Sequence, residues 1–404
     1  MPTKPRPVVS RKRRVVFGLV TAVAVWLIVD TGAYFFLNWI STRFGIFYGL
    51  RAPTDDEIRA FTEIGFHPVF GWDLRKTVAR GPLGEKKGHD YALQPRYKAK
   101  AFGDSFVEGV RNPKNSFEYS VEELTGWQCL NFGVSGYGPD QATLKYQANT
   151  VSTEYAILGM LDENIGRVVN RLRGFYTLEE SYRTKPRYVV GEAGVVTLLP
   201  NPISNPRDLE KLKDPAYVDE LRRDDYWSKY YEGLNAPYEL RWPATAVLVP
   251  HADFFALQGL RLAQHAIRPT YESSLWRSRH YHLYDEKSEG IAIMRHVVDE
   301  FAAAARAKGE TPIILVFAAG ETMEIMAEFH RKPYQPLVDH LGRTGVEFID
   351  VGEVFLKEKD FKRFYINGDG HLNEIGNRRV AEEIVRLIRV LDGRAGAHAG
   401  QTGP

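Results

Sequence analysis

The chain has 404 residues, enough for one large domain with insertions or for two smaller domains. It contains one cysteine, Cys129, which excludes an internal disulfide and any metal cluster built on cysteines. The formal charge of the whole chain is +2. Residues 1–14 contain several basic residues and no acidic residue, and the rest of the chain has a small net negative charge. A nucleic-acid-binding protein normally carries its positive charge on the folded body, so this distribution argues against nucleic acid as a partner.

An apolar segment follows this basic tail. Residues 15–29 are apolar apart from Gly18 and Thr21, and the apolar character resumes over residues 32–40. A helix needs roughly 20 such residues to cross a bilayer. The preceding bases predict a membrane anchor at 15–40 with a cytoplasmic N-terminus and an extracytoplasmic body, periplasmic or at the cell surface. A cleaved signal peptide is the alternative, although no clean small-x-small site follows.

Asp30 interrupts the predicted span. A carboxylate at the centre of a membrane helix costs about 2.5–3.5 kcal/mol, and less near the interface. One interpretation puts Asp30 in the outer half of the span, close to the headgroups. The other is a polar contact with a second membrane helix, which a chain with a single span cannot supply and which implies a membrane-protein partner.

After the anchor, residues 41–95 are charged and rich in turns, and we interpret them as a linker or approach segment. Residues 96–392 then alternate between apolar strand-like runs and amphipathic helical patterns. Because each strand is followed by a helix, right-handed crossovers predict a three-layer α/β/α sandwich of the flavodoxin-like type, with a five-stranded parallel sheet. Gly393 is expected to stop the last helix, and residues 393–404 to be disordered. The predicted strands are 97–102, 127–132, 154–160, 312–317 and 346–351, and the predicted helices are 116–124, 140–150, 163–173, 291–307, 336–343 and the segment before Gly393.

The alternation fails over about 189–287, which we interpret as a large insertion covering the catalytic edge of the sheet. Its aromatic residues could stack on sugars, bind acyl chains, or pack a core of the insertion itself. Residues 240–262 carry too many charges for a second span, although an interfacial helix remains possible. His280 and His282 are expected to share a strand face, but they lack a third metal ligand. The aromatic residues are Tyr217, Tyr226, Trp227, Tyr230, Tyr231, Tyr238, Trp242, Tyr271, Trp276, Tyr281 and Tyr284.

Candidate chemistry begins at Gly103-Asp104-Ser105, directly after the first predicted strand. Ligands of open parallel sheets bind at the carboxyl ends of the strands. A serine there needs a base, and His371 in Asp369-Gly370-His371 is the histidine with a neighbouring acid. Acyl transfer also needs donors for an oxyanion. The loop 131–138 after the second strand could offer a backbone N–H beside a glycine, and Asn164 after the third strand could offer its amide.

In this order the segments resemble the blocks of the SGNH/GDSL hydrolase superfamily, over roughly residues 97–173 and 290–391. The resemblance implies that Ser105 is the nucleophile, that His371 is the base, and that Ser105, Gly136 (rather than Gly133) and Asn164 hold the oxyanion. Two departures exist. The third block is usually Gly-x-Asn-Asp, which the spacing from Gly159 to Asn164 does not match. The acid usually precedes histidine by three residues, where this chain has Gly368, whereas Asp369 precedes it by two.

The sequence therefore predicts an exported, membrane-anchored serine esterase or O-acyltransferase, acting through Ser105, His371 and Asp369 without a cofactor. The resemblance further suggests an acyl ester or glycan substrate, such as O-acetyl groups of a cell-surface polysaccharide. The alternative is a catalytically inactive SGNH-like scaffold or glycan-binding module in an envelope complex. Individual residues also have structural alternatives: Ser105 or Asn164 could cap a helix, Asp369 could serve only a turn, and Ser135 mimics a nucleophile elbow that Tyr137 disfavours.

Overall fold

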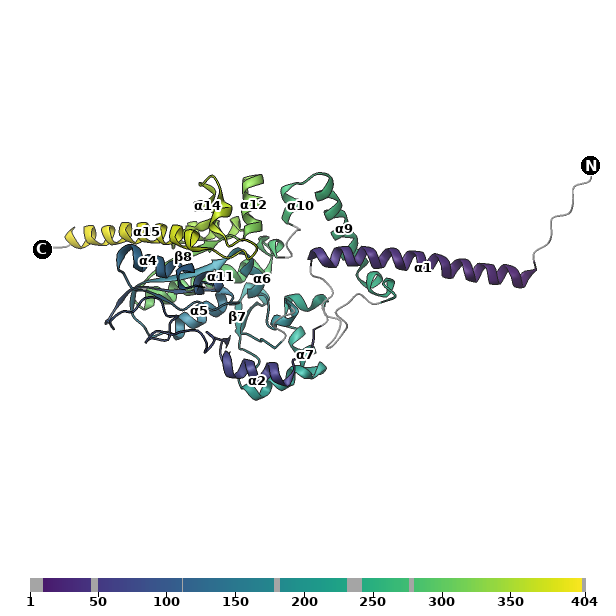
Figure 1. Cartoon of the computed structure of the whole chain (residues 1–404), viewed down its shortest axis with the longest axis horizontal. Helices are drawn as coiled ribbons and strands as arrows, with labels where there is room; N and C mark the ends of the chain where they lie inside the picture. Colours follow the sequence, from purple (N-terminus) through teal and green to yellow (C-terminus); the bar gives the residue numbers. More distant parts are fainter. Residues whose placement is uncertain are drawn as a thin grey trace, which may run out of the picture. The chain divides into compact units, whose positions relative to one another are not determined.

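The computed structural model describes residues 10–44, 50–110, 112–177, 182–230, 242–275 and 280–401 (Figure 1). The chain forms two compact units, and each combines segments that are distant in sequence. The smaller unit joins residues 1–49 to residues 236–277, and the larger unit contains residues 50–235 and 278–404. The insertion expected at about 189–287 is therefore divided between the two units.

The smaller unit is built around α1 (Arg11–Phe44). Over Arg11–Ile40 this helix is long and apolar enough to cross a membrane, and it is the one such span in the described part of the chain. A second helical segment packs against it, and Figure 1 shows this segment beside the C-terminal part of α1. Its elements are α8 (Thr245–Leu248), η8 (Val249–His251) and α9 (Ala252–Ile267), with α10 (Tyr271–Leu275) following.

Asp30 is fully buried against this second segment. Its carboxylate accepts hydrogen bonds from the N–H of Ala244 at 3.0 Å, and from the N–H and hydroxyl of Thr245 at 2.7 and 2.6 Å. A carboxylate at the start of a helix satisfies N–H groups that the first turn leaves open. The chain thus supplies a polar partner for Asp30 from residues 244–245, which are not part of a second candidate span among the described residues. A membrane-protein partner near Asp30 stays a prediction.

The larger unit is an α/β sandwich around a five-stranded parallel sheet, which confirms the predicted fold class. The direction in which successive strands are added reverses between β3 and β5. β4 lies on one side of β3, whereas β5, β8 and β9 follow in turn on its other side. In such sheets, ligands bind outside the carboxyl ends of the strands where the order reverses. In spatial order the strands are β4 (Cys129–Asn131), β3 (Tyr97–Phe102), β5 (Thr153–Leu161), β8 (Thr311–Phe317) and β9 (Glu347–Asp350).

Helices cover both faces of this sheet. α4 (Phe117–Thr125) packs with α15 (Glu374–Gln401), as Figure 1 also shows. On the other face, α11 (Glu289–Ala307) packs with α5 (Pro139–Ala148) and with α13 (Gln335–Thr344). Right-handed crossovers between parallel strands produce this division into two helical layers. The remaining short elements of this region are η1 (Pro113–Asn115), α12 (Gly320–Phe329), α14 (Val351–Leu356) and η10 (Phe361–Phe364).

Two helices differ from the prediction. The helix expected over 163–173 is reduced to η2 (Asp162–Asn164) and α6 (Ile165–Val168), followed by η3 (Arg173–Phe175). The reason is tertiary: the carboxylate of Asp225 accepts the N–H groups of Arg171 and Leu172, which a continuing helix would have bonded internally. At the other end of the chain, α15 continues past Gly393 to Gln401. Gly393 is therefore not a stop, and the alanines after it have a high helix propensity that tolerates one glycine.

Residues 50–95 are folded and contribute to the core of the larger unit. α2 (Asp55–Ile64) begins with a capping box between Thr54 and Glu57. It is followed by the short antiparallel strands β1 (Phe66–His67) and β2 (Gly71–Trp72). Phe61 and Trp72 are buried in the main apolar cluster. The sequence pattern favours a linker here because the few apolar residues of this segment are dispersed among charges.

The described aromatic residues at 217–227 and 281–284 pack within the larger unit. Trp227 is buried, and its indole N–H donates to the carbonyl oxygen of Gly166 at 2.7 Å. His280 and His282 lie at a 3₁₀ turn rather than on a strand, and the ring of His282 bonds the hydroxyl of Tyr226 at 2.6 Å. Tyr231, Tyr238 and Trp276 lie outside the described residues. The elements here are β6 (Arg187–Val190), η5 (Glu192–Gly194), β7 (Val196–Leu199), η6 (Pro206–Lys213), α7 (Pro215–Arg222), η7 (Tyr226–Tyr230) and η9 (Tyr281–Tyr284).

Candidate active site

Ser105 begins α3 (Ser105–Glu108), a single helical turn directly after β3. Asp104 caps this turn, because its Oδ1 accepts the N–H of Phe106 at 2.9 Å. Gly103, before it, has no room for a side chain: a Cβ there would lie 2.4 Å from the carbonyl oxygen of Gly159 on β5. This tight passage from strand to helix puts Ser105, which is partly exposed, at the carboxyl edge of β3.

His371 lies in the loop between η10 and α15. The N–H of Ile366 donates to the carbonyl oxygen of His371 at 2.7 Å, and the N–H of Asp369 donates back to Ile366 at 3.1 Å. Gly368 and Gly370 have φ angles of +72° and +81°, in the left-handed region that glycine adopts readily. The glycine that stands three residues before His371 therefore serves the turn, which leaves Asp369 as the acid nearest to the ring.

The structure brings Ser105, His371 and Asp369 together. Nε2 of His371 lies 2.8 Å from Oγ of Ser105, across 266 positions of sequence. Nδ1 of the same ring is bonded to Oδ1 of Asp369. When Nδ1 carries a proton and donates it to the carboxylate, Nε2 is left as an acceptor for the serine hydroxyl. This is the arrangement that a serine nucleophile requires of its base.

Asp104 connects the Ser105 turn to the end of β5. Its carboxylate is buried and accepts from the amide Nδ2 of Asn164 at 2.9 Å and from Nη1 of Arg167 at 3.1 Å. Burial raises the pKa of Asp104, and the charge of Arg167 is the largest effect acting in the opposite direction. Because Asp104 is the acceptor, the Asn164 amide presents its NH₂ group, not its oxygen, to the Ser105 turn.

Three donors are candidates for an oxyanion site. The N–H groups of Ser105 and Gly136 have no hydrogen-bond acceptor among the described residues. Nδ2 of Asn164 carries a second hydrogen beyond the one given to Asp104. The N–H of Gly133 is not available, because it donates to Oδ1 of Asn131 at 3.0 Å. Of the two glycines, Gly136, with φ at +83°, is therefore the one whose N–H is available.

The structural alternatives for these residues can be compared with the same contacts. Asp104, not Ser105, is the residue that caps α3. Asn164 precedes α6 but makes no side-chain capping bond to it. The hydroxyl of Ser135 donates to the carboxylate of Glu108 at 2.6 Å, so its bonding partner is an acid and not a histidine. Neither capping interpretation describes Ser105 or Asn164.

Two residues of the site region were not singled out in the sequence. Arg167 donates from Nη1 to Asp104 and, at 3.0 Å, to the carbonyl oxygen of Tyr137, so one guanidinium connects the segments that carry Ser105, Gly136 and Asn164. Trp72 donates its indole N–H to the carbonyl oxygen of Ser135 at 3.1 Å and packs edge-on against Tyr137. Only the arginine's i,i+4 spacing from an acid, Glu163, could have drawn attention.

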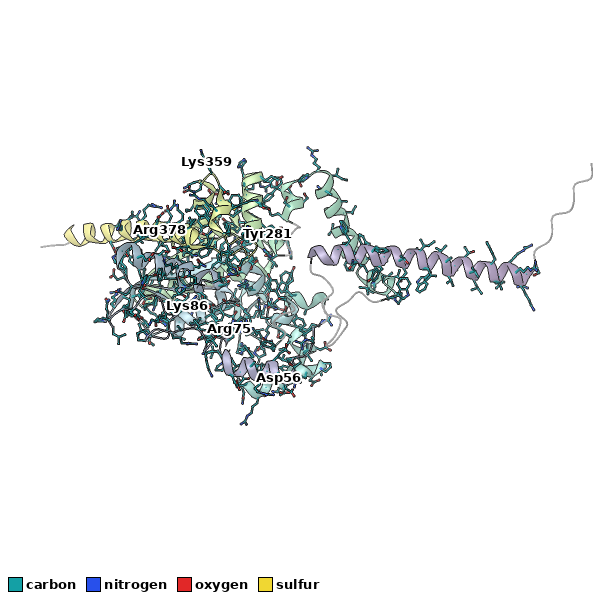
Figure 2. The ribbon with its side chains drawn as sticks, in the orientation of Figure 1. Asp56, Arg75, Lys86, Tyr281, Lys359 and Arg378 are labelled. Carbon is teal, nitrogen blue, oxygen red and sulfur yellow. The ribbon has the colours of Figure 1, made fainter. Side chains whose placement is uncertain are left out.

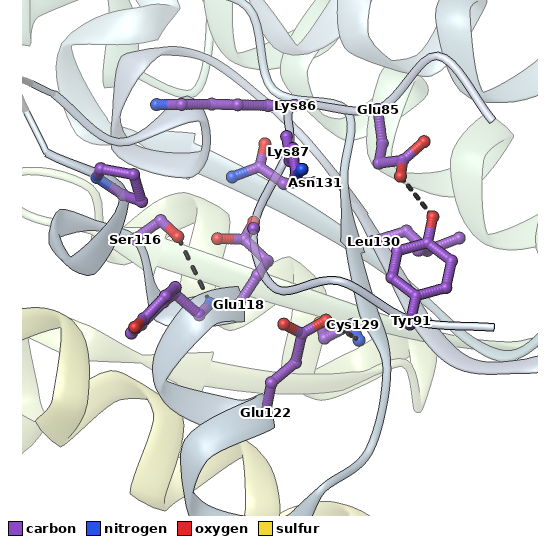
Figure 3. A pocket seen from close by; sticks show the side chains of 13 residues that line it. Glu85, Lys86, Lys87, Tyr91, Ser116, Glu118, Glu122, Cys129, Leu130 and Asn131 are labelled. Atoms are coloured by element: carbon purple, nitrogen blue, oxygen red, sulfur yellow. Dashed lines mark hydrogen bonds between the residues drawn. The ribbon is translucent and has the colours of Figure 1, made fainter. Parts of the chain in front are cut away.

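A small cavity of about 20 Å³, room for one water, lies between α4, β4 and residues 85–91 (Figure 3). Burial raises the pKa of Glu118 well above its usual value and that of Glu122 to about 7. Nζ of Lys86 donates to the carbonyl oxygens of Glu108 and Gly109 at 2.6 and 2.8 Å. No cluster of three potential metal ligands occurs in the described ranges. Through its bonds to Glu108 and Gly109, the cavity residue Lys86 stabilises the C-terminal end of α3.

No family model and no curated protein sequence matches this chain. Among solved structures, it is similar to a protein from Desulfitobacterium hafniense DCB-2 that is described as a lipolytic protein of the G-D-S-L family. The identity is 9%, the TM-score is 0.34, and the match covers 72% of this chain and 99% of the other.

Proposed function

We propose that this chain is a serine esterase or O-acyltransferase of the SGNH/GDSL type. The observation that carries the proposal is the 2.8 Å contact between Oγ of Ser105 and Nε2 of His371, together with the Asp369 carboxylate on the other ring nitrogen. Serine, imidazole and carboxylate in this sequence of contacts form the constellation used for acyl transfer on several unrelated folds. The site lies where the strand order of the sheet reverses, the usual ligand position in such folds.

In the proposed reaction, His371 accepts the hydroxyl proton as Oγ of Ser105 attacks an ester carbonyl. The negative charge that develops on the carbonyl oxygen is stabilised by the N–H groups of Ser105 and Gly136 and by the amide of Asn164. His371 then donates its proton to the leaving alcohol, and the acyl group remains on Ser105. Attack by water completes an esterase cycle, and attack by a second hydroxyl completes a transferase cycle.

We propose further that α1 anchors the protein in a membrane. This helix starts with the four basic residues 11–14, and its apolar side chains are exposed along most of its length. Basic residues before a span favour a cytoplasmic N-terminus, which would put the site in an extracytoplasmic compartment. The resemblance to exported, anchored members of the SGNH/GDSL superfamily suggests O-acetyl groups of a cell-surface polysaccharide as the substrate.

A fluorophosphonate probe, which reacts with activated serines, tests the proposal on the full chain in mild detergent. The wild type should be labelled, and Ser105→Ala should not. Ser135→Ala is the matched control and should keep the label, because its hydroxyl bonds Glu108. A folded wild type that resists labelling would favour the inactive scaffold. With p-nitrophenyl acetate as donor and an oligosaccharide as acceptor, free acetate indicates hydrolysis, whereas acetylated oligosaccharide indicates transfer.

A further inference from the structure

The smaller unit exposes apolar side chains beyond those of α1 itself. On α9, Leu260 and Ile267 are exposed by 70% and 84%, and Val249, just before α9, is exposed by 69%. Phe255 is buried in the shared core with α1, and Gly259 lies against Phe36. α9 therefore has one apolar side against α1 and a second apolar side that no described residue covers.

The exposed side is continuous along the helix. Ala256, Leu260, Ala263 and Ile267 recur at the spacing of one helical face, and all four are exposed. Asp253 and Gln264 are also exposed, and Asp253 lies seven residues before Leu260, on the same face at the start of the helix. The exposed face is therefore polar in its first turn, apolar from Ala256 to Ile267, and bordered by Gln264. This is the composition of helices that lie in the plane of a membrane interface, with apolar side chains toward the acyl chains.

Asp30 fixes the depth of this segment along α1. It follows Val15 by 15 residues, or about 23 Å of helix, whereas the hydrocarbon layer is about 30 Å thick. If that layer begins at Val15, Asp30 lies in its outer part, and Leu37 and Ile40 lie at its outer boundary. Because Asp30 caps α8, and Leu37 and Ile40 pack in the core shared with α8 and α9, the second segment lies at the same boundary.

An aromatic pair gives a second indication of depth. Trp242, just before α8, meets Trp26 of α1 edge-on, with ring centroids 6.0 Å apart. Both rings are about half exposed. Trp26 follows Val15 by 11 residues, or about 17 Å of helix, so by the same count it lies near the middle of the hydrocarbon layer. An exposed apolar pair at that depth favours lipid, rather than bulk water, around residue 242.

We propose that residues 242–267 lie in the outer leaflet of the membrane, with Leu260 and Ile267 against lipid and with the Asp30 carboxylate holding the start of the segment to α1. The occupant of the exposed face is thus the bilayer itself. This inference rests on the proposed anchoring by α1. It gives Asp30 a role: the carboxylate replaces its hydration with three donors from Ala244 and Thr245 and so can remain within the span.

The test uses the full chain in phosphatidylcholine vesicles, with a nitroxide on single cysteines. Cys129 is buried and is replaced by alanine in every variant. Leu260→Cys and Ile267→Cys are the test positions. Ile28→Cys, exposed on α1, is the lipid reference. Lys359→Cys, exposed on the larger unit (Figure 2), is the water reference. We expect labels at 260 and 267 to collide with oxygen severalfold more than with a water-soluble nickel chelate, as at 28 and unlike 359.

Each contrary result has a distinct meaning. Nickel accessibility at 260 and 267 with protection at 28 overturns the interfacial segment and leaves the anchor intact. Labels shielded from both reagents at 260 and 267 indicate a protein contact, such as a second copy, and also overturn the proposal. Nickel accessibility at 28 overturns the anchoring together with the inference. Fluorophosphonate labelling of Ser105 is measured on the same samples and does not depend on any of these outcomes.

Asp30→Leu tests how the segment is held. The substitution makes α1 more apolar, so protection at position 28 should persist, whereas the label at 260 should become several times more accessible to nickel. Asp30→Asn keeps one acceptor oxygen and should produce a smaller change. An unchanged label at 260 in Asp30→Leu would show that the carboxylate does not hold the segment.

Discussion

Arg167→Met removes the cation that connects the segments of the candidate site. The wild-type guanidinium donates to the buried Asp104 at 3.1 Å, to the carbonyl oxygen of Tyr137 at 3.0 Å, and to Glu163 at 2.9 Å. Breaking a buried ion pair costs about 3–5 kcal/mol, because the remaining charge is left without compensation. The bond to Glu163 adds little, because that carboxylate is one-third exposed. We expect the free energy of unfolding to fall by about 3–5 kcal/mol.

The assay is urea unfolding of the full chain in mild detergent, followed by tryptophan fluorescence. A double-mutant cycle with Asp104→Asn isolates the pair, since the amide no longer needs a cation. The two substitutions should be coupled by about 2 kcal/mol. We also expect fluorophosphonate labelling to slow by about 100-fold in Arg167→Met, because a small displacement of catalytic groups lowers the rate of an enzyme by that order. Additive costs in the cycle, or a single variant within about 0.5 kcal/mol of wild type, would refute this account of Arg167.

Three other substitutions address the acid, the strand crossing and the pH response. Asp369→Asn should lower the labelling rate by about 10²–10⁴-fold with little loss of stability, because the amide no longer stabilises a protonated His371; wild-type rates would leave Asp369 as a turn residue. Gly103→Ala should lower the urea midpoint strongly, because its Cβ would lie 2.4 Å from the carbonyl oxygen of Gly159; an unchanged midpoint would contradict that packing. Burial raises the pKa of Asp162 from 3.8 to about 7, so stability should fall between those pH values as the unfolded chain releases the proton first. In Asp162→Asn the urea midpoint should fall less over this pH range than in the wild type. Profiles of the two proteins that run parallel would contradict the raised pKa of Asp162.

The strands could be predicted because each buried parallel strand is a short apolar run. Tyr97–Phe102 has the predicted bounds, and the strand expected at 312–317 differs by one residue. Helix lengths were less predictable. The helix after β5 ends early because Asp225, more than fifty positions later in the chain, takes the N–H groups of Arg171 and Leu172. No local pattern contains that contact.

The candidate triad could be proposed from the sequence because Ser105 directly follows a predicted strand, His371 has an acid beside it, and the segments that carry them resemble the SGNH/GDSL blocks. The sequence also favoured Gly136 over Gly133, and the bond from Gly133 to Asn131 agrees with that preference. Arg167 and Trp72 could not be found in this way. Their significance comes from bonds to the carbonyl oxygens of Tyr137 and Ser135, and every residue has a carbonyl oxygen.

The sequence alone determined the α/β class, the five strands, the apolar N-terminal helix and the residues proposed for chemistry, because hydrophobic period and residue type are local properties. The tertiary structure decided which distant groups satisfy one another. It paired Asp30 with residues 244–245, connected the site segments through Arg167, and divided the insertion between two units. Buried charges and orphan N–H groups require partners, but any segment of the chain can supply them, and only the fold selects which one does.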